Sequence, residues 1–85
     1  MYTFSYNLRY YRRKKGITVG EMARRLHVER SIIWRWENNE RYPSISTLYD
    51  IARVLEIDVT KLVERNENAL LADDLWGDGT NNPAE

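Results

Sequence analysis

Two short helical patterns with almost nothing between them dominate the middle of the chain. Thr18 and Glu21 match the S/T-x-x-E capping box, which marks the start of a helix over 19–26. A second stretch with helical periodicity follows directly over 30–38. The residues in between leave room only for a tight turn. The sequence therefore predicts two short helices joined as one local unit.

Apolar side chains at helical spacing predict three more helices, and no stretch shows the alternation of a strand. The first ends in a basic run over 12–15, followed by Gly16, where a left-handed residue can end a helix. Ser44 and Asp58 can cap the last two. The predicted ranges are 5–15, 45–55 and 59–64. We therefore expect an all-α fold, a compact domain of five helices over 1–65.

Charge is distributed unevenly along the 85 residues, although 13 basic and 13 acidic residues give a net charge of zero. Residues 1–65 hold all 13 basic residues and eight acidic ones, a net charge of +5. Residues 66–85 hold five acidic residues and no basic one. We interpret the chain as a basic helical domain with an acidic, partly disordered C-terminal tail over 66–85. The zero net charge then does not argue against a nucleic-acid partner.

Composition argues against several classes of protein and site. With no cysteine and one histidine, we expect no disulfide framework, no metal site and no cofactor. No apolar run approaches the roughly 18 residues of a membrane span, and the N-terminus lacks the apolar core of a signal peptide. No nucleophile–base pair or phosphate-binding glycine loop indicates an enzyme. We expect a cytoplasmic protein without enzymatic activity that does not bind a membrane.

Two short helices joined this closely form a helix-turn-helix pattern, and the residues around it are similar to those of a known family. Residues 7–63 resemble the lambda-repressor-like, Cro-type helix-turn-helix regulators that bind DNA. The spacing agrees across all five predicted helices, with the helix-turn-helix at the second and third. The matching stretches are LRYYR (8–12), KGIT (15–18), EMARRL (21–26), VERSII (28–33), WENN (36–39) and PS (43–44), with Leu48, Ile51, Ala52, Leu55 and Leu62.

The resemblance implies that helix 30–38 lies in the major groove of DNA and that its first turns contact base edges. By motif position, the base-contacting residues are Arg30, Ser31 and Arg35, with Glu29 and Trp34 beside them. Arginine can donate two hydrogen bonds to O6 and N7 of guanine. Arg30 and Arg35 stand about 140° apart round a helix, so both reach bases only if the helix lies nearly along the groove. Trp34 should point outward, toward DNA or a protein partner.

The same resemblance implies phosphate contacts at the start of helix 19–26 and in the loop after helix 30–38. The residues at these positions are Thr18, Val19, Asn39 and Arg41. The family often carries glutamine where this chain has Val19, which can offer only its backbone N–H. His27 stands where the family usually has glycine, so either it adopts a positive φ or the turn differs.

Two further pairings follow from the resemblance. The positions of Arg12 and Glu37 form an ion pair between the first and third helices in the family, and losing one partner would leave a buried charge unmatched. A homodimer follows from the two-fold symmetry of operators. The candidate interface consists of Val59, Val63, Leu70 and Leu71. The alternative is that Leu70, Leu71, Leu75 and Trp76 form a loosely packed tail.

We interpret the chain as a sequence-specific regulator of transcription, a repressor that binds double-stranded DNA as a dimer on an inverted repeat. The alternative is a protein-interaction module or antitoxin-like partner with weak or no DNA binding. Val19, Trp34 and the neutral overall charge favour this alternative. The acidic tail can dock a protein partner, or it can compete with phosphates for the basic face of the domain.

Overall fold

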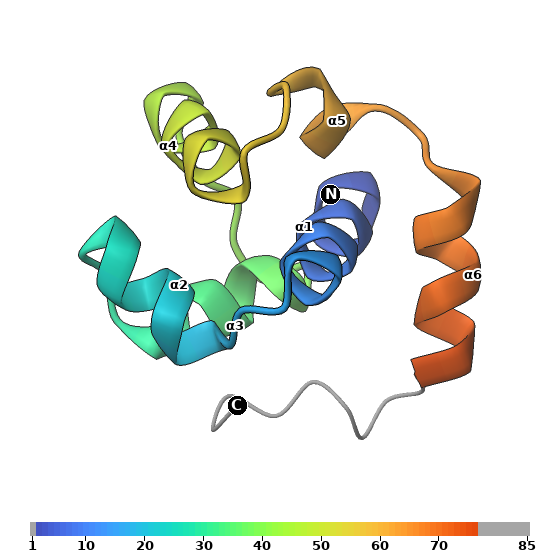
Figure 1. The fold of residues 1–85 in the computed structure, drawn as a ribbon, viewed down its shortest axis with the longest axis horizontal. Coiled ribbons are helices and arrows are strands. Elements are labelled where there is room, and N and C mark those ends of the chain that lie inside the picture. The colour runs from blue at the N-terminus through green and yellow to red at the C-terminus, as the bar shows by residue number, and fades with distance from the viewer. Residues whose placement is uncertain (1, 77–85) are drawn as a thin grey trace.

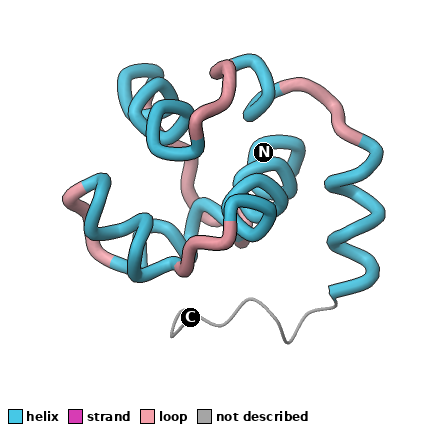
Figure 2. Tube along the Cα trace, viewed as in Figure 1, coloured by secondary structure: helices cyan, strands magenta, loops and turns pink. Residues whose placement is uncertain are grey.

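The computed structural model describes residues 2–76, which fold into six helices joined by short loops (Figure 2). The helices are α1 Tyr2–Lys15, α2 Val19–Leu26, α3 Arg30–Glu37, α4 Ile45–Leu55, α5 Thr60–Val63 and α6 Glu67–Trp76. The predicted all-α class is confirmed, and the structure adds α6 to the five predicted helices. None of the helices in residues 2–76 has the length and apolar character needed to cross a membrane.

α1 is the central helix and packs against α3, α4, α5 and α6 (Figure 1). It begins at Tyr2, one turn earlier than predicted. α2 packs against α3 and α4, and α6 lies on the opposite side of α1 from α2. The helix-turn-helix pair thus rests on α1 and α4, and α6 leaves it uncovered.

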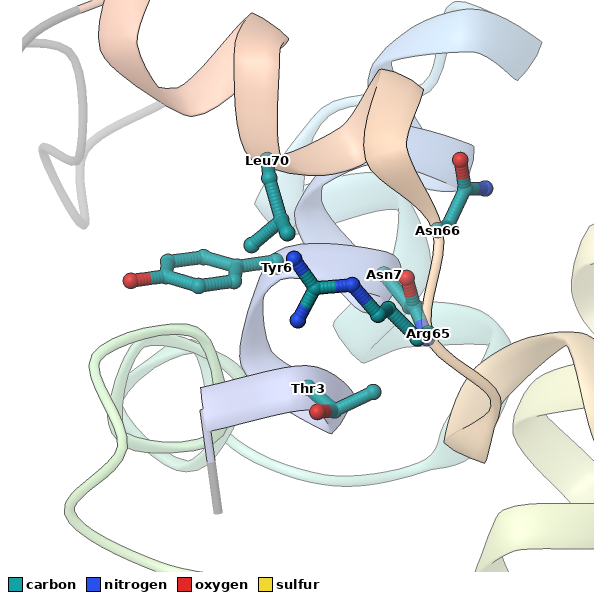
Figure 3. Close-up of a pocket in the computed structure, with 6 residues that line it drawn as sticks. All are labelled: Thr3, Tyr6, Asn7, Arg65, Asn66 and Leu70. Atoms are coloured by element: carbon teal, nitrogen blue, oxygen red, sulfur yellow. The ribbon is translucent and has the colours of Figure 1, made fainter.

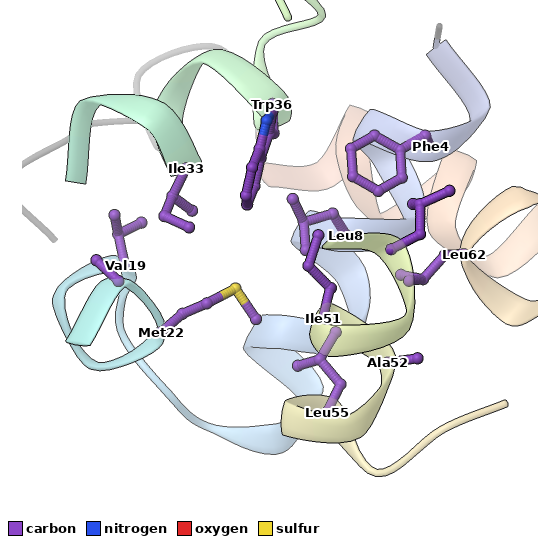
Figure 4. Packing of buried hydrophobic residues seen from close by; sticks show 12 residues of the cluster. Phe4, Leu8, Val19, Met22, Ile33, Trp36, Ile51, Ala52, Leu55 and Leu62 are labelled. Carbon is purple, nitrogen blue, oxygen red and sulfur yellow. The ribbon is translucent and has the colours of Figure 1, made fainter. Parts of the chain in front are cut away.

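The core consists of the apolar stripes that predicted the first five helices (Figure 4). One cluster joins Phe4 and Leu8 of α1, Met22 of α2, Ile33 of α3 and Ile51 of α4, each with 0 % exposure. Burying a side chain of this size stabilises a fold by about 1.5–3 kcal/mol relative to leaving it in water. The inner faces of α2 and α3 are therefore set by the same core that holds α1 and α4.

His27 forms the turn between α2 and α3 in the left-handed conformation, with φ 58° and ψ 43°. Its N–H faces the carbonyls of Ala23 and Arg24, and α2 ends there. His27 thus adopts the positive φ that was one of the two expectations for this position. Gly16 ends α1 with φ 82°, as predicted. The left-handed region costs a residue other than glycine about 1–2 kcal/mol, so packing holds this turn against the backbone preference of histidine.

Half of the predicted capping box forms at the start of α2. Thr18 Oγ1 accepts a hydrogen bond from the N–H of Glu21 at 3.0 Å. The carboxylate of Glu21 pairs with Arg24 and Arg25, which follow it on the same helix. Side chains three and four residues apart are neighbours on a helix surface, so these ion pairs replace the second half of the box.

α6 lies in the segment that we expected to be an acidic tail, in which helical periodicity fades and residues 69–71 add at most one turn of helix. Asn66 Oδ1 accepts hydrogen bonds from the N–H groups of Asn68 and Ala69 and so caps the helix. Ala69 is 1 % exposed, whereas Leu71 is 61 % exposed. Leu70 is partly buried and its neighbour Leu71 is exposed, so the apolar residues of α6 do not form one buried stripe that periodicity could reveal. Residues 77–85 of the tail that we expected to be partly disordered lie outside the described residues.

Candidate nucleic-acid interface

α3 presents opposite faces to the core and to solvent. Ile33 and Trp36 are buried, whereas Ser31 and Arg35 are exposed. Ser31 and Arg35 each stand about 160° from Ile33 round the helix. Two of the predicted base-contacting residues therefore share the outermost strip of α3.

The other three predicted base-contacting residues flank that strip. Glu29 is the exposed N-cap of α3, but its side chain makes no capping hydrogen bond. Arg30 lies against α2, where a β-carbon at Gly20 would be 2.7 Å from Arg30 Nη2. Trp34 is partly buried rather than pointing fully outward as predicted, because it stands only about 100° from Ile33. Four of the five predicted residues are therefore exposed, Arg30 included, and Trp34 is partly buried.

α1 donates hydrogen bonds to the C-terminal end of α3. Ser5 Oγ donates to the Trp36 carbonyl at 2.7 Å, and Arg9 Nη1 donates to the Glu37 carbonyl at 2.6 Å. All four residues are at most 4 % exposed. The last carbonyls of a helix have no partner within it, so these buried donors satisfy them. Our sequence reasoning missed both donors, although Arg9 stands one turn before Arg12 on the same face.

The loop after α3 bonds the two remaining carbonyls of the last turn. Asn38 donates to the Trp34 carbonyl from its backbone N–H at 2.9 Å and from its side-chain Nδ2 at 2.8 Å. The N–H of Glu40 donates to the Arg35 carbonyl at 2.9 Å. The carbonyls of residues 34–37 are therefore all bonded, which fixes the end of α3 to the rest of the fold.

Arg12 and Glu37, predicted to form an ion pair, are brought together beside this end of α3. Arg12 Nε and Nη2 donate to the two carboxylate oxygens of Glu37 at 2.5 and 3.1 Å, and both side chains are 3 % exposed. Arg12 Nη1 donates to the carbonyl of Ile17 at 3.0 Å. One guanidinium therefore joins α1, α3 and the segment that leads into α2.

The four predicted phosphate-contacting residues lie at the start of α2 and after α3. Thr18 is exposed, and its hydroxyl oxygen caps α2. Val19 is 2 % exposed and its side chain belongs to the core, so this side chain cannot contact a ligand. Asn39 is partly buried with φ 60°, and Arg41 is exposed beside it.

The basic run at the end of α1 makes contacts within the protein. Lys15 Nζ lies 2.8 Å from Glu56 Oε1, and this hydrogen bond lowers the pKa of the Glu56 carboxyl. Lys14 Nζ lies 5.5 Å from the centre of the Tyr10 ring. Arg12 is buried, as described above. Lys15 therefore ties the end of α1 to the residue after α4, and Lys14 lies near a ring of its own helix.

The four predicted dimer residues differ in exposure: Val59 and Leu70 are partly buried, whereas Val63 and Leu71 are exposed. Val59 packs against the core. Leu70 lines a pocket of about 270 Å³ between α1 and α6 (Figure 3). Val63 and Leu71 are 43 % and 61 % exposed. These last two residues are the more exposed members of the predicted set.

The pocket between α1 and α6 also shows how the C-terminal segment is attached. Its lining residues are Thr3, Tyr6, Asn7, Arg65, Asn66 and Leu70 (Figure 3). Asn7 Nδ2 donates to the carbonyls of Leu62 and Glu64 at 3.0 and 2.8 Å. Asn66 Nδ2 lies 3.1 Å from the hydroxyl of Tyr11. Asn7, which our sequence reasoning also missed, therefore holds the end of α5 against α1.

Comparison with known proteins finds a matching family model and a relative of this chain. A family model described as helix-turn-helix matches residues 8–62. The chain is 29 % identical over 70 residues to the HTH-type transcriptional activator BcrR of Enterococcus faecalis. This alignment covers 82 % of the chain and 34 % of the relative, so the chain spans about a third of that protein's length. No solved structure matches the chain.

Proposed function

The chain belongs to the helix-turn-helix family, and from this membership we propose that it is a sequence-specific DNA-binding regulator of transcription. In this proposal α3 enters the major groove. The observation that supports it best is the outer strip of α3, where Ser31 and Arg35 are exposed while Ser5 and Arg9 bond the end of the helix. A helix already ordered in this way binds without the entropic cost of ordering.

The proposal extends to a homodimer that represses transcription from an inverted repeat. Two-fold symmetric operators bind two copies of a helix-turn-helix domain. Of the four predicted interface residues, Val63 and Leu71 are exposed and so available to such a contact. Because the Enterococcus faecalis relative is named an activator, a reporter gene placed behind the bound site is needed to give the direction of regulation.

Selection of bound DNA from a random pool, using the full chain, tests the proposal. We expect enrichment of one inverted repeat and an affinity that falls steeply as salt is raised. Arg35→Ala should weaken binding to the selected site about tenfold or more and relax the preference at one base pair. Arg65→Ala is the matched control, because Arg65 is exposed and pairs with Glu67 beside α6. It should bind as the wild type does.

A protein-interaction module is the second candidate function. Ile45 and Tyr49 of α4 are 74 % and 54 % exposed and stand one helical turn apart, which gives a partner an apolar contact surface. Failure to enrich any DNA, together with stoichiometric co-purification of another protein, would favour this candidate. Ile45→Asp should then abolish the co-purification.

A further inference from the structure

Arg30 occupies a different place on α3 from Ser31 and Arg35. It stands about 60° from Ile33, the centre of the buried face, whereas the other two stand about 160° from it. Its guanidinium lies flat against α2, where a β-carbon at Gly20 would be 2.7 Å from Nη2 and 3.0 Å from both Cζ and Nε. Only glycine at position 20 leaves room for the guanidinium in this place.

The charge of Arg30 is available to an external anion. Within residues 2–76, Arg30 forms no ion pair. The neighbouring carboxylate on α2, that of Glu21, is already paired with Arg24 and Arg25. The Arg30 guanidinium is thus held by van der Waals contact with Gly20, and its donors are not consumed by a carboxylate.

We propose that Arg30 contacts a phosphate at the edge of the major groove, while Ser31 and Arg35 contact the bases. This assignment rests on the proposed function. An α-helix of about 10–12 Å diameter nearly fills a major groove about 12 Å wide. Residues on the outermost strip of such a helix meet base edges, and residues on its flank meet the phosphates that line the groove.

Assigning Arg30 to a phosphate and Arg35 to a base accounts for two observations: the angle between these two residues and the burial of Val19. Arg30 and Arg35 stand about 140° apart, which is too far for both to contact bases unless the helix follows the groove. Val19 is 2 % exposed, so its side chain cannot contact the DNA backbone at the start of α2. Arg30, lying against Gly20 in the same turn of α2, supplies a cation there. Gly20 is in this sense a positioning residue, because it leaves room for Arg30 beside α2, where the guanidinium meets a phosphate.

Binding by the full chain to its selected site, to single-base variants of that site and to random DNA, at several salt concentrations, tests the assignment. Arg30→Ala should weaken binding to all of these sequences by the same factor, about five- to tenfold. It should also reduce the slope of log affinity against log salt by about 1. Arg35→Ala should instead remove discrimination at one base pair.

Gly20→Ala tests the packing that holds Arg30. The added methyl group displaces the guanidinium from α2, so we expect the same uniform loss of affinity as for Arg30→Ala. The double variant should bind no more weakly than either single variant. A melting temperature at or above that of the wild type serves as the folding control, since alanine favours a helix over glycine.

Two results would overturn the assignment while the wild-type chain binds DNA. One is an Arg30→Ala variant that changes the preference at one base pair with an unchanged salt slope, which would make Arg30 a base contact. The other is a Gly20→Ala variant that binds as tightly as the wild type, together with a double variant (Gly20→Ala with Arg30→Ala) that binds more weakly than Gly20→Ala alone. Absence of DNA binding by the wild-type chain is a separate result that overturns the proposed function, and this assignment with it.

Discussion

Replacing Arg12 by methionine should destabilise the fold more than any other single loss of charge within residues 2–76. The substitution keeps the apolar stem but leaves the Glu37 carboxylate charged at 3 % exposure. It removes two hydrogen bonds to Glu37 and a third to the carbonyl of Ile17. Breaking a buried pair in this way costs about 3–5 kcal/mol. A chain of this size has a total stability of about 4–13 kcal/mol, so much of it would be lost.

Urea unfolding monitored by tryptophan fluorescence measures this cost, because Trp36 is buried next to Glu37. The double variant Arg12→Met, Glu37→Leu should recover most of the loss, since a packed apolar pair leaves no charge unmatched. Lys15→Met is the matched control. It breaks an ion pair of similar length that is open to water, with Glu56 77 % exposed, and should leave the unfolding midpoint close to that of the wild type.

The reasoning is refuted if Arg12→Met and Lys15→Met shift the midpoint equally. It is also refuted if the double variant loses as much as the two single variants added together, because the pair would then have no coupling energy. Either result would mean that the end of α3 is held without this ion pair.

Three further predictions concern a turn, a cap and a titration. His27→Gly should raise the free energy of unfolding by about 1–2 kcal/mol, because glycine adopts a φ of 58° without strain. Gly16→Ala should lower the free energy of unfolding, because Gly16 has a φ of 82°. Shifts of the same sign in the two variants would contradict this reasoning. Asn66→Ala should remove about 1 kcal/mol of local stability and speed amide exchange in α6, whereas exchange that quickens equally in α2 would argue against a local cap. A hydrogen bond from the Thr60 backbone N–H lowers the pKa of Asp58, so its stabilisation is complete above the ordinary value of 3.8 and is lost as pH falls through the lowered one. Acid titration of Asp58→Asn should accordingly show a shallower loss of stability below pH 3.8 than the wild type shows.

Much of the fold was predictable because helix signals are local. The cap at Thr18, the left-handed Gly16 and the apolar stripes each depend on residues within one or two turns. These signals predicted five helices and placed α2 and α3 together. The pairing of Arg12 with Glu37 came from the family resemblance, since nothing local joins residues 25 positions apart.

α6 shows the limit of these local signals. Its cap, Asn66, is a turn residue like many others, and one of its two adjacent leucines is exposed. The helix is stabilised where Ala69 is buried against α1 and where Asn66 bonds to Tyr11, 55 residues away. Periodicity along the sequence carries no information on such long-range contacts, so residues 67–76 were predicted to belong to a tail.

The sequence by itself determined the place of the first five helices, within about a turn, and which polar residues α3 carries, because propensity, capping and periodicity act within a few residues. The tertiary structure decided what those polar residues can touch. It buried Ser5 and Arg9 against the end of α3, withdrew the side chain of Val19 into the core, and laid Arg30 on Gly20. The physical reason is that exposure and contact depend on how helices pack across long stretches of sequence, and a charge acts according to what it lies against.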